Sequence, residues 1–519
     1  MKKFPIAAHL DLKGVQYRHD YYEEYFQNLS RLGYDAVLVE YEDVFPFQSV
    51  SLSRYPEELW SPEFLQHFLK LASDAGIEVI PLQQCLGHME YVFRQPAYRK
   101  FSIPGKEPRD LQIALPEARE WFRKMLKEVL AAHTDSRYIH LGMDEARSFA
   151  AYARGEGKDP LDMFLEYLEE LCGICAEFGK TPLIWSDMLE DHIAPENIER
   201  LKALREKVIL VPWNYFAGIK PEGMVRFSGL RCSRKWLEEP EGGPSDVNLF
   251  PDGLLHFEDW APEIKELTAE FQVSPWLMEP LFQAAIWKRL GFRVWGGAGG
   301  SITQDRSILP YYNWRSANIQ LWKETIERYQ LDGLIITHWA RSNSCTVPNI
   351  NPDAVWPILA KAVSPDNSCK TFFPDAEQVD RIFFQIGKCR EEWNIEKSLI
   401  QEMKQIKVSE HAFEWKTITL LLEVLYIHKC LLSREEQCSC FAGIGRMSEI
   451  GWKEHSDILA QIEPELSSLQ DQVREHLEKR YFGHALEEWF YKIFTTSQEL
   501  IDRLKITIEE SKAKYSKMR

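Results

Sequence analysis

Short apolar runs alternate with longer segments of helical periodicity over roughly the first two thirds of the chain. Each run has the length and composition of a buried strand, and the segment after it repeats its apolar positions with the period of a helix. Strands that alternate with helices form a parallel sheet, so eight such units predict an α/β fold, a (β/α)8 TIM barrel, over residues 1–365. The expected strands are Ile6–Leu12, Ala36–Tyr41, Glu78–Leu82, Tyr138–Gly142, Leu183–Trp185, Val208–Trp213, Phe292–Trp295 and Leu334–Trp339.

Two segments depart from this alternation. Residues 216–272, between the sixth and seventh strands, are too long for one helix and carry the turn signals Gly242 to Pro244 and Pro251 to Gly253. We expect an insertion there. Strand signals stop after Pro365, and residues 366–519 show long amphipathic helical patterns that contain many charged residues. The sequence therefore predicts an all-helical C-terminal domain after the barrel.

Composition and charge exclude several classes of function. Of 519 residues, 45% are hydrophobic and 27% charged, which is typical of a globular protein. Acidic residues outnumber basic ones 79 to 62, and the net charge of −17 repels phosphate backbones and anionic lipids. We therefore expect neither a nucleic-acid nor a membrane partner. The sequence shows no signal peptide and no long apolar segment, so its ten cysteines favour reduced thiols and a cytoplasmic location.

The ends of the predicted strands carry most of the candidate chemistry. In a TIM barrel the carboxyl ends of all strands meet at one face, where active sites lie. Aromatic rings stack on the C–H faces of sugar rings, and carboxylates accept hydrogen bonds from hydroxyl groups, so this mixture predicts a pocket for a small carbohydrate. In chain order the candidates are Asp11, Lys13, Glu40, His88, Asp144, Glu145, Trp185, Asp187, Trp213, Tyr215, Trp295 and Trp339.

The adjacent acids Asp144 and Glu145 are the sharpest of these signals. Neighbouring residues on an extended strand point to opposite sides, so both acids reach one substrate only if the chain bends where the strand ends. Taken alone, the dipeptide is explained equally well by a helix cap at Asp144 and a solvated Glu145. The surrounding motifs favour the functional interpretation.

These motifs, in the same order, resemble the strand ends of glycoside hydrolase family 20, the β-N-acetylhexosaminidases, and most closely its hexosaminidase D branch. The resemblance covers nearly the whole chain and is carried by His9 to Gly14, Glu40 to Asp43, Gly87 to Glu90, His140 to Glu145 and Trp185 to Met188. It implies an exo-acting enzyme that releases terminal β-linked GalNAc or GlcNAc from the non-reducing end with retention of configuration. It implies no cofactor and no metal.

The resemblance also implies a role for each acid. In this family the 2-acetamido oxygen of the substrate attacks the anomeric carbon and forms an oxazolinium-like intermediate. Glu145 would be the general acid and then the general base, with a pKa raised by burial and by Asp144. Asp144 would orient the acetamido group and stabilise the positive charge that develops on it.

The remaining candidates would form the sugar pocket. Trp185, Trp213 and Trp339 resemble its walls, Tyr215 resembles the donor to the acetamido oxygen, and His88 resembles a histidine beside the acids. Secreted members usually hold the outer hydroxyl groups with an arginine after the first strand. Here that region offers Asp11 and Lys13, and lysine lacks the arginine fork.

Other functions stay open from the residues alone. A metal-dependent TIM-barrel hydrolase would use His88, His140 and His338 near the strand ends, although His9 and Asp11 do not form the usual pair of alternating histidines. A non-catalytic protein that binds amino sugars is a second alternative, and the adjacent acids argue against it. An apolar stripe at Leu420, Leu421, Leu422 and Leu425 leaves a homodimer possible, although packing within the chain also explains it.

Overall fold

The computed structural model describes residues 4–518 apart from 106, 191, 219–223, 228–229, 234–260, 275–276, 306–307, 344, 349–350, 392–393 and 444–448. Most of the predicted insertion at 216–272 therefore lies outside the described residues. Its described parts include the antiparallel strand pair β8 (Met224–Phe227) with β9 (Leu230–Ser233). A second antiparallel pair, β10 (Gln272–Ser274) with β11 (Leu277–Met278), begins at the last residue of the predicted insertion.

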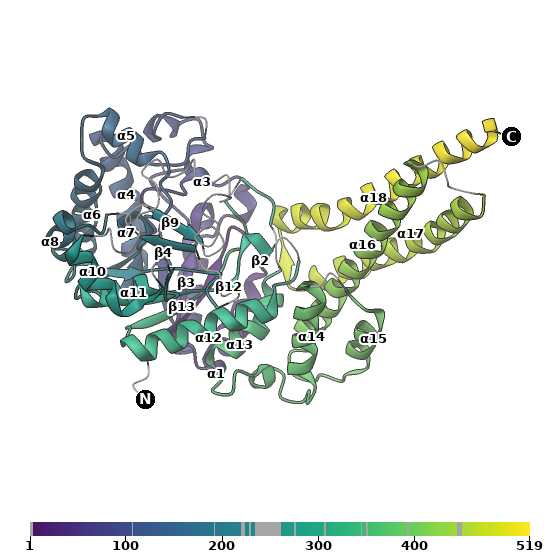
Figure 1. Cartoon of the computed structure of the whole chain (residues 1–519). Coiled ribbons are helices and arrows are strands. Elements are labelled where there is room, and N and C mark those ends of the chain that lie inside the picture. The colour runs from purple at the N-terminus through teal and green to yellow at the C-terminus, as the bar shows by residue number, and fades with distance from the viewer. Residues whose placement is uncertain are drawn as a thin grey trace. The chain divides into compact units, whose positions relative to one another are not determined.

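Eight parallel strands close into a barrel, which confirms the predicted fold class. Ala7 pairs with Ala36 on one side and with Ile335 on the other, so the first strand joins the second and the last. Figure 1 shows the strands surrounded by helices. In barrel order the strands are β1 (Ile6–Asp11), β3 (Ala36–Glu40), β4 (Glu78–Leu82), β5 (Tyr138–His140), β6 (Thr181–Trp185), β7 (Ile209–Val211), β12 (Arg293–Ser301) and β13 (Gly333–His338).

Local sequence signals set where the surrounding helices begin. The Ser61 hydroxyl caps α2 by accepting a hydrogen bond from the backbone N–H of Phe64, and Asp159 caps α6 in the same way. A proline follows each cap, at the position where its missing N–H is harmless. The helices are α1 (Tyr22–Leu32), α2 (Pro62–Asp74), α3 (Glu90–Phe93), α4 (Pro116–Ala132), α5 (Phe149–Gly155), α6 (Pro160–Glu177), α7 (Asp187–Glu190), α8 (Ile198–Lys202), α10 (Pro262–Thr268), α11 (Phe282–Arg289) and α12 (Tyr312–Tyr329).

The barrel interior is filled by apolar side chains. Leu38, Ile80 and Ile335 are fully buried there, together with the larger rings of Trp185 and Trp295. Because strand side chains alternate between the two faces, each strand contributes every second residue to this core.

The chain divides into two compact units. The first comprises Met1–Lys13, Tyr22–Ile302 and Trp314–Thr346 and contains the barrel strands. The second comprises Gly14–Tyr21, Thr303–Asn313 and Val347–Arg519. The predicted division into domains at 1–365 and 366–519 stays a prediction. Elements of the second unit are β2 (Gln16–Tyr17), α13 (Trp356–Val363), α14 (Val379–Glu391), α15 (Lys397–Gln405), α16 (Ala412–Gly443), α17 (Glu449–Leu477), β14 (Tyr481–Phe482) and α18 (His484–Met518).

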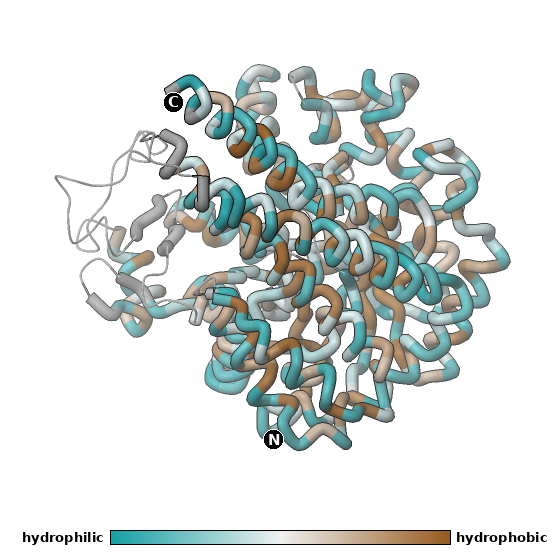
Figure 2. Tube along the Cα trace, turned by 90° about the vertical axis from the view of Figure 1, so that its right-hand side faces the viewer, coloured by the Kyte–Doolittle hydropathy of each residue, from teal (hydrophilic) through white to brown (hydrophobic). Residues whose placement is uncertain are grey.

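The long helices of the second unit pack on one another. Figure 1 shows α16, α17 and α18 running side by side, and each contacts the other two. Apolar and polar positions alternate along the helix that ends at the C-terminus in Figure 2, as expected for amphipathic helices. The stripe from Leu420 to Leu422 with Leu425 is buried within the chain itself, so it offers no open face to a second copy. A homodimer stays a prediction.

A buried ionic cluster lies within this unit. Arg480 contacts Asp353 at 3.1 Å and pairs with Glu414, while the guanidinium stacks 4.0 Å from the ring centre of Tyr21. The strand pair β2 and β14 is antiparallel, with Tyr17 opposite Tyr481. None of the helices in the described part of the chain has the length and apolarity that traversing a lipid bilayer requires.

Candidate active site

The chain bends sharply after β5, as the two adjacent acids require. Gly142, Met143 and Glu145 have φ angles of 66°, 76° and 46°. A Cβ atom on Gly142 would lie 1.9 Å from Oε1 of Gln84, so both the backbone angle and the available space select glycine there. Left-handed backbone is uncommon for other residues, and such residues gather at functional sites.

His88 bridges the two acids. Its Nε2 lies 3.4 Å from Oδ2 of Asp144 and 3.5 Å from Oε2 of Glu145. His88 follows β4 and also has left-handed backbone, with φ at 55°. The Asp144 side chain is 10% exposed and that of Glu145 is 33% exposed. Asp144 is therefore the inner acid and Glu145 the outer one.

Asp187 and Arg109 hold the bend in place. Oδ2 of Asp187 accepts a hydrogen bond from the backbone N–H of Glu145 at 3.0 Å, and Oδ1 accepts one from Nε1 of Trp213 at 3.3 Å. Arg109 donates to the backbone carbonyl of Glu145 at 3.2 Å. Asp187 thus holds the bend that carries the two adjacent acids, and its expected contact with the substrate stays a prediction. Arg109 lies in the loop before α4, away from any strand end, so the strand-end pattern did not find it.

The electrostatics of the acids differ from the expectation. A raised pKa was expected for Glu145, and that prediction is wrong, because its hydrogen bond with His88, aided by Arg147 and Arg109, lowers its pKa to about 2. Burial raises the pKa of Asp144 to about 7, although His88 opposes this shift. Burial acts to lower the pKa of His88, but Asp144 and Glu145 outweigh it and raise the value to about 9. Because His88, Asp144 and Glu145 interact closely, their protons are gained and lost in steps that belong to the set of three groups together.

Three aromatic residues form a connected wall. The ring of Trp213 stacks on Tyr215, with ring centres 5.1 Å apart, and Nε1 of Trp339 donates to the Tyr215 hydroxyl at 3.0 Å. Burial, and to a smaller extent the charges of Asp144 and Glu145, raise the pKa of Tyr215. Tyr215 is thus close enough to both acids for their charges to affect its pKa.

Trp185 lies behind this wall. Its ring centre is 5.9 Å from that of Trp339 and 4.3 Å from that of His140. It is 1% exposed and belongs to the barrel core. The structure therefore brings Trp185 next to the wall, as a buried support for Trp339.

Trp295 is not brought together with these residues, which corrects its expected place in the pocket. β12 continues from Trp295 through the glycine run to Ser301, so Trp295 lies early in its strand. It pairs with Gly333, the first residue of β13, and its ring lies 5.5 Å from that of Tyr138, the first residue of β5. Trp295 thus fills the amino-terminal end of the core, where the missing side chain of Gly333 leaves room for the indole ring.

A buried charged cluster occupies the carboxyl ends of β1 and β3. Lys13 pairs with Glu40 and lies 3.2 Å from Oδ1 of Asp11. Oε1 of Glu40 accepts a hydrogen bond from Gln84 at 3.1 Å, which fixes its orientation. The Lys13 ammonium lies 5.1 Å from the ring centre of Trp339, so this cluster adjoins the aromatic wall.

Of the histidines considered for the metal-hydrolase alternative, His140 and His338 are neutral, as is His9, whereas His88 is a cation beside the two acids. Burial lowers the pKa of His9 to about 3 and that of His338 to about 4, and it lowers the pKa of His140 well below the usual value. His140 lies within β5, as expected. Across the described residues of the barrel, no three histidine, cysteine or acidic side chains at the strand ends bring ligand atoms close enough to share a metal ion.

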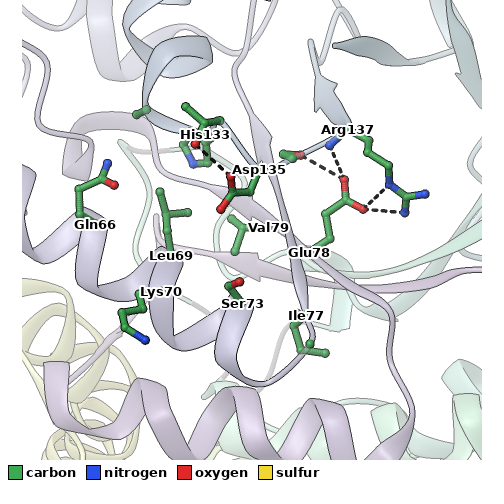
Figure 3. Close-up of a pocket in the computed structure, with 14 residues that line it drawn as sticks. Gln66, Leu69, Lys70, Ser73, Ile77, Glu78, Val79, His133, Asp135 and Arg137 are labelled. Atoms are coloured by element: carbon green, nitrogen blue, oxygen red, sulfur yellow. Dashed lines mark hydrogen bonds and ion pairs between the residues drawn. The ribbon is translucent and has the colours of Figure 1, made fainter. Parts of the chain in front are cut away.

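A groove of about 430 Å³ lies at the other end of the barrel. Figure 3 shows its lining, which comes from α2, the start of β4 and the loop before β5. Glu78 there accepts hydrogen bonds from both the backbone and the guanidinium of Arg137. The groove faces the amino-terminal ends of the strands, so it is separate from the candidate active site.

Comparison with known proteins identifies the family. Residues 20–224 match the family model described as "Glycosyl hydrolase family 20, catalytic domain". The bovine (Bos taurus) protein named Hexosaminidase D is 30% identical over 270 residues, which cover 48% of this chain and 75% of that protein. The chain belongs to glycoside hydrolase family 20. Within this family 20 chain, the matched region contains Asp144, Glu145, Trp213 and Tyr215, whereas Trp339 lies outside it.

Two further comparisons describe the extent of the likeness. Human (Homo sapiens) Hexosaminidase D is 30% identical over 231 residues, so the match covers 42% of this chain and about half of the relative, 46%. Among solved structures, the β-N-acetylhexosaminidase from Bacteroides fragilis NCTC 9343 has 15% identity and a TM-score of 0.43. That alignment covers 76% of this family 20 chain and 70% of the other chain.

Proposed function

We propose that the chain is an exo-acting β-N-acetylhexosaminidase that releases terminal β-linked GalNAc or GlcNAc from the non-reducing end. Its membership of family 20 and its similarity to two proteins named Hexosaminidase D support this proposal. The observation that carries it is the pair of acids after β5, with Asp144 buried, Glu145 at the mouth and His88 in contact with both.

The proposed reaction retains the anomeric configuration and uses the substrate as its own nucleophile. The acetamido oxygen attacks C1 while the glycosidic C–O bond breaks, and Glu145 gives its proton to the leaving oxygen. Asp144 stabilises the positive charge that develops on the acetamido group. Water then attacks C1 and opens the oxazolinium ring, and Glu145 takes the proton of that water. Holding the acetamido group against C1 makes the attack an oriented intramolecular step.

His88 supplies a source for the proton that Glu145 needs. In the free protein Glu145 is ionised, and the proton of the set resides on His88, whose pKa is about 9. Nε2 of His88 lies 3.5 Å from Oε2 of Glu145. We infer that the proton moves from His88 to Glu145 when the substrate excludes water, because a low local dielectric favours two neutral groups over an ion pair. The positive charge that develops on the acetamido group would keep Asp144 ionised during this transfer.

The sugar ring would lie against the wall of Trp213, Tyr215 and Trp339. Aromatic rings of this size stack on the C–H face of a pyranose. The cluster of Lys13, Asp11 and Glu40 adjoins Trp339 and would hold the outer hydroxyl groups in place of the usual arginine. Because the resemblance is to the hexosaminidase D branch, we expect GalNAc to be accepted as well as GlcNAc or better.

Turnover of p-nitrophenyl β-GalNAc and β-GlcNAc by the purified protein tests this proposal. NMR of the first product formed, before it mutarotates, should show the β-anomer. Release of the α-anomer would contradict retention, and loss of activity in EDTA that added metal restores would contradict the mechanism without a metal. Failure to hydrolyse either glycoside would contradict the proposed activity.

We also propose a cytoplasmic location. Cys85, Cys172 and Cys175 are buried thiols that form no disulfide. Reduced thiols are the usual state in a reducing compartment. Immunodetection after fractionation of cells that make the protein naturally tests this, and recovery outside the cytoplasm would contradict it.

A further inference from the structure

Arg147 lies at the outer edge of the candidate active site. Its Nη2 donates to Oε2 of Glu145 at 3.1 Å, and its side chain is 70% exposed. Arg147 follows Glu145 by two positions, in the short loop before α5. Within the described part of the chain, Glu145 is the one carboxylate with which Arg147 pairs. Arg147 therefore stands between the catalytic acid and solvent.

The other two cations beside the acids, His88 and Arg109, contact carboxylates inside the protein. His88 contacts both Asp144 and Glu145. Nε of Arg109 lies 3.3 Å from Asp110 and 3.7 Å from Glu90, and its side chain is 13% exposed. The charges of His88 and Arg109 are thus offset inside the protein. Among the residues that the structure describes, Glu145 is the carboxylate that offsets the charge of Arg147.

The proposed reaction removes that one partner. Glu145 carries a proton when it acts as the general acid, and a neutral carboxyl group does not offset a guanidinium charge. The leaving oxygen lies one hydrogen bond from Glu145, and Arg147 lies one hydrogen bond from the same carboxyl group. Arg147 therefore reaches groups on the first residue of the leaving saccharide. Its planar fork matches a carboxylate in bidentate geometry.

We propose that Arg147 is an anion-binding subsite for the leaving saccharide, so that the enzyme favours substrates whose first leaving residue carries a carboxylate beside the linkage. A hexuronic acid linked through O4 has this arrangement, because its carboxylate is attached to the neighbouring carbon, C5. This inference rests on the proposed hexosaminidase activity and specifies its substrate class. The net charge of −17 repels anions at long range, so the preference depends on direct contact with Arg147.

The carboxylate would also help Glu145 to hold the proton that the reaction uses. Arg147 is one of the groups that lower the pKa of Glu145. An anion that offsets the charge of Arg147 raises that pKa in the complex, so Glu145 holds its proton to higher pH. A neutral leaving saccharide does not have this effect.

Two matched disaccharides test the inference. GalNAc-β-1,4-glucuronic acid carries the carboxylate, and GalNAc-β-1,4-glucose carries a hydroxymethyl group at the same carbon. We expect the wild type to favour the uronic acid at least tenfold in kcat/KM, and Arg147→Gln to bring this ratio close to one. Arg154→Gln removes a charge from an exposed position on α5 and should keep the wild-type ratio. The falling limb of the kcat pH profile should lie at higher pH for the uronic acid in the wild type only.

The outcomes separate this inference from the proposed function. Equal kcat/KM values for the two disaccharides in the wild type would overturn the subsite, as would an equal loss on both in Arg147→Gln. Either result leaves the hexosaminidase activity intact. Preference for a disaccharide with glucose 6-sulfate over the uronic acid would overturn the assignment to a carboxylate. Failure to cleave these disaccharides and aryl β-N-acetylhexosaminides alike would overturn the activity itself.

Discussion

Nε2 of His88 lies 3.4 Å from Oδ2 of Asp144, and each group shifts the pKa of the other. Asp144 is the largest influence that raises the pKa of His88 against the effect of burial, and His88 is the largest influence that opposes the rise in the pKa of Asp144. With Glu145 ionised beside them, the set holds one proton between about pH 7 and pH 9.

This relationship predicts a bell-shaped pH profile. Asp144 has to be ionised to stabilise the acetamido cation, so kcat/KM should rise as pH increases through about 7. The set has to keep the proton of His88 for Glu145, so kcat/KM should fall as pH increases through about 9. Measuring kcat/KM on p-nitrophenyl β-GalNAc from pH 5 to 10 tests both limbs. A maximum below about pH 6 would contradict this assignment of the proton.

His88→Asn should move the rising limb to higher pH, because Asp144 loses the cation that lowers its pKa. His67→Asn changes an exposed histidine on α2 and serves as the matched control. We expect the control to keep both limbs. If His88→Asn left the rising limb at the wild-type pH, that limb would not result from the ionisation of Asp144.

Glu145→Gln should separate substrates by their leaving groups. The amide cannot donate a proton to the leaving oxygen, so turnover of a disaccharide should fall about 10²- to 10⁴-fold. Aryl glycosides with an acidic phenol as leaving group need little protonation, so the rate of their first step should fall far less. The ratio of kcat/KM for 2,4-dinitrophenyl and methyl glycosides measures this difference. An equal loss on both would show that Glu145 is not the acid.

Asp144→Asn should instead reduce turnover of good and poor leaving groups alike. Both require stabilisation of the charged acetamido group, whose loss costs about 10²- to 10³-fold in kcat. A thiazoline analogue of the cyclised intermediate should inhibit the wild type strongly and this variant weakly. Equal inhibition constants in the two proteins would argue against substrate assistance.

The sequence predicted the barrel and the pair of acids because both depend on local patterns. Apolar runs of strand length mark the eight strands, and a strand that ends at His140 leaves Asp144 and Glu145 at the mouth. The position of Trp295 could not be predicted in this way, because a glycine run after a strand fits both a loop and a continued strand. Here the narrow space beside Trp322 and Trp213 admits only glycine within the strand.

The charge state of Glu145 depends on distances that no local pattern encodes. His88, Arg109 and Arg147 come from three different loops and meet around it only in the folded barrel. Each of them favours the ionised carboxylate, so the expected effect of burial is outweighed. Strand-end reasoning found His88 but neither arginine.

Arg480 should stabilise the helical unit strongly. It is the cation between Asp353 and Glu414, both fully buried, so Arg480→Ala removes the arginine charge that these two carboxylates share. Loss of one partner from a buried pair costs about 3–5 kcal/mol in the free energy of unfolding. Arg474→Ala removes a more exposed arginine paired with Glu487 and should cost less than about 1 kcal/mol. Urea unfolding followed by circular dichroism compares the two variants. Equal destabilisation would contradict this role of Arg480.

Two tryptophans of the same barrel provide the last test, since the structure places one in the wall and one in the core. Trp339→Phe removes the indole N–H that binds the Tyr215 hydroxyl, so Tyr215 loses the contact that orients it beside the acids. A hydrogen bond of this kind contributes about 1 kcal/mol, so KM for p-nitrophenyl β-GalNAc should rise about fivefold. Trp295→Phe instead leaves a cavity at the amino-terminal end of the barrel, which should lower Tm while KM stays at the wild-type value. An equally large rise in KM for Trp295→Phe and for Trp339→Phe would indicate that Trp295 contacts the substrate. It would contradict the position of Trp295 in the core at the amino-terminal end of the barrel.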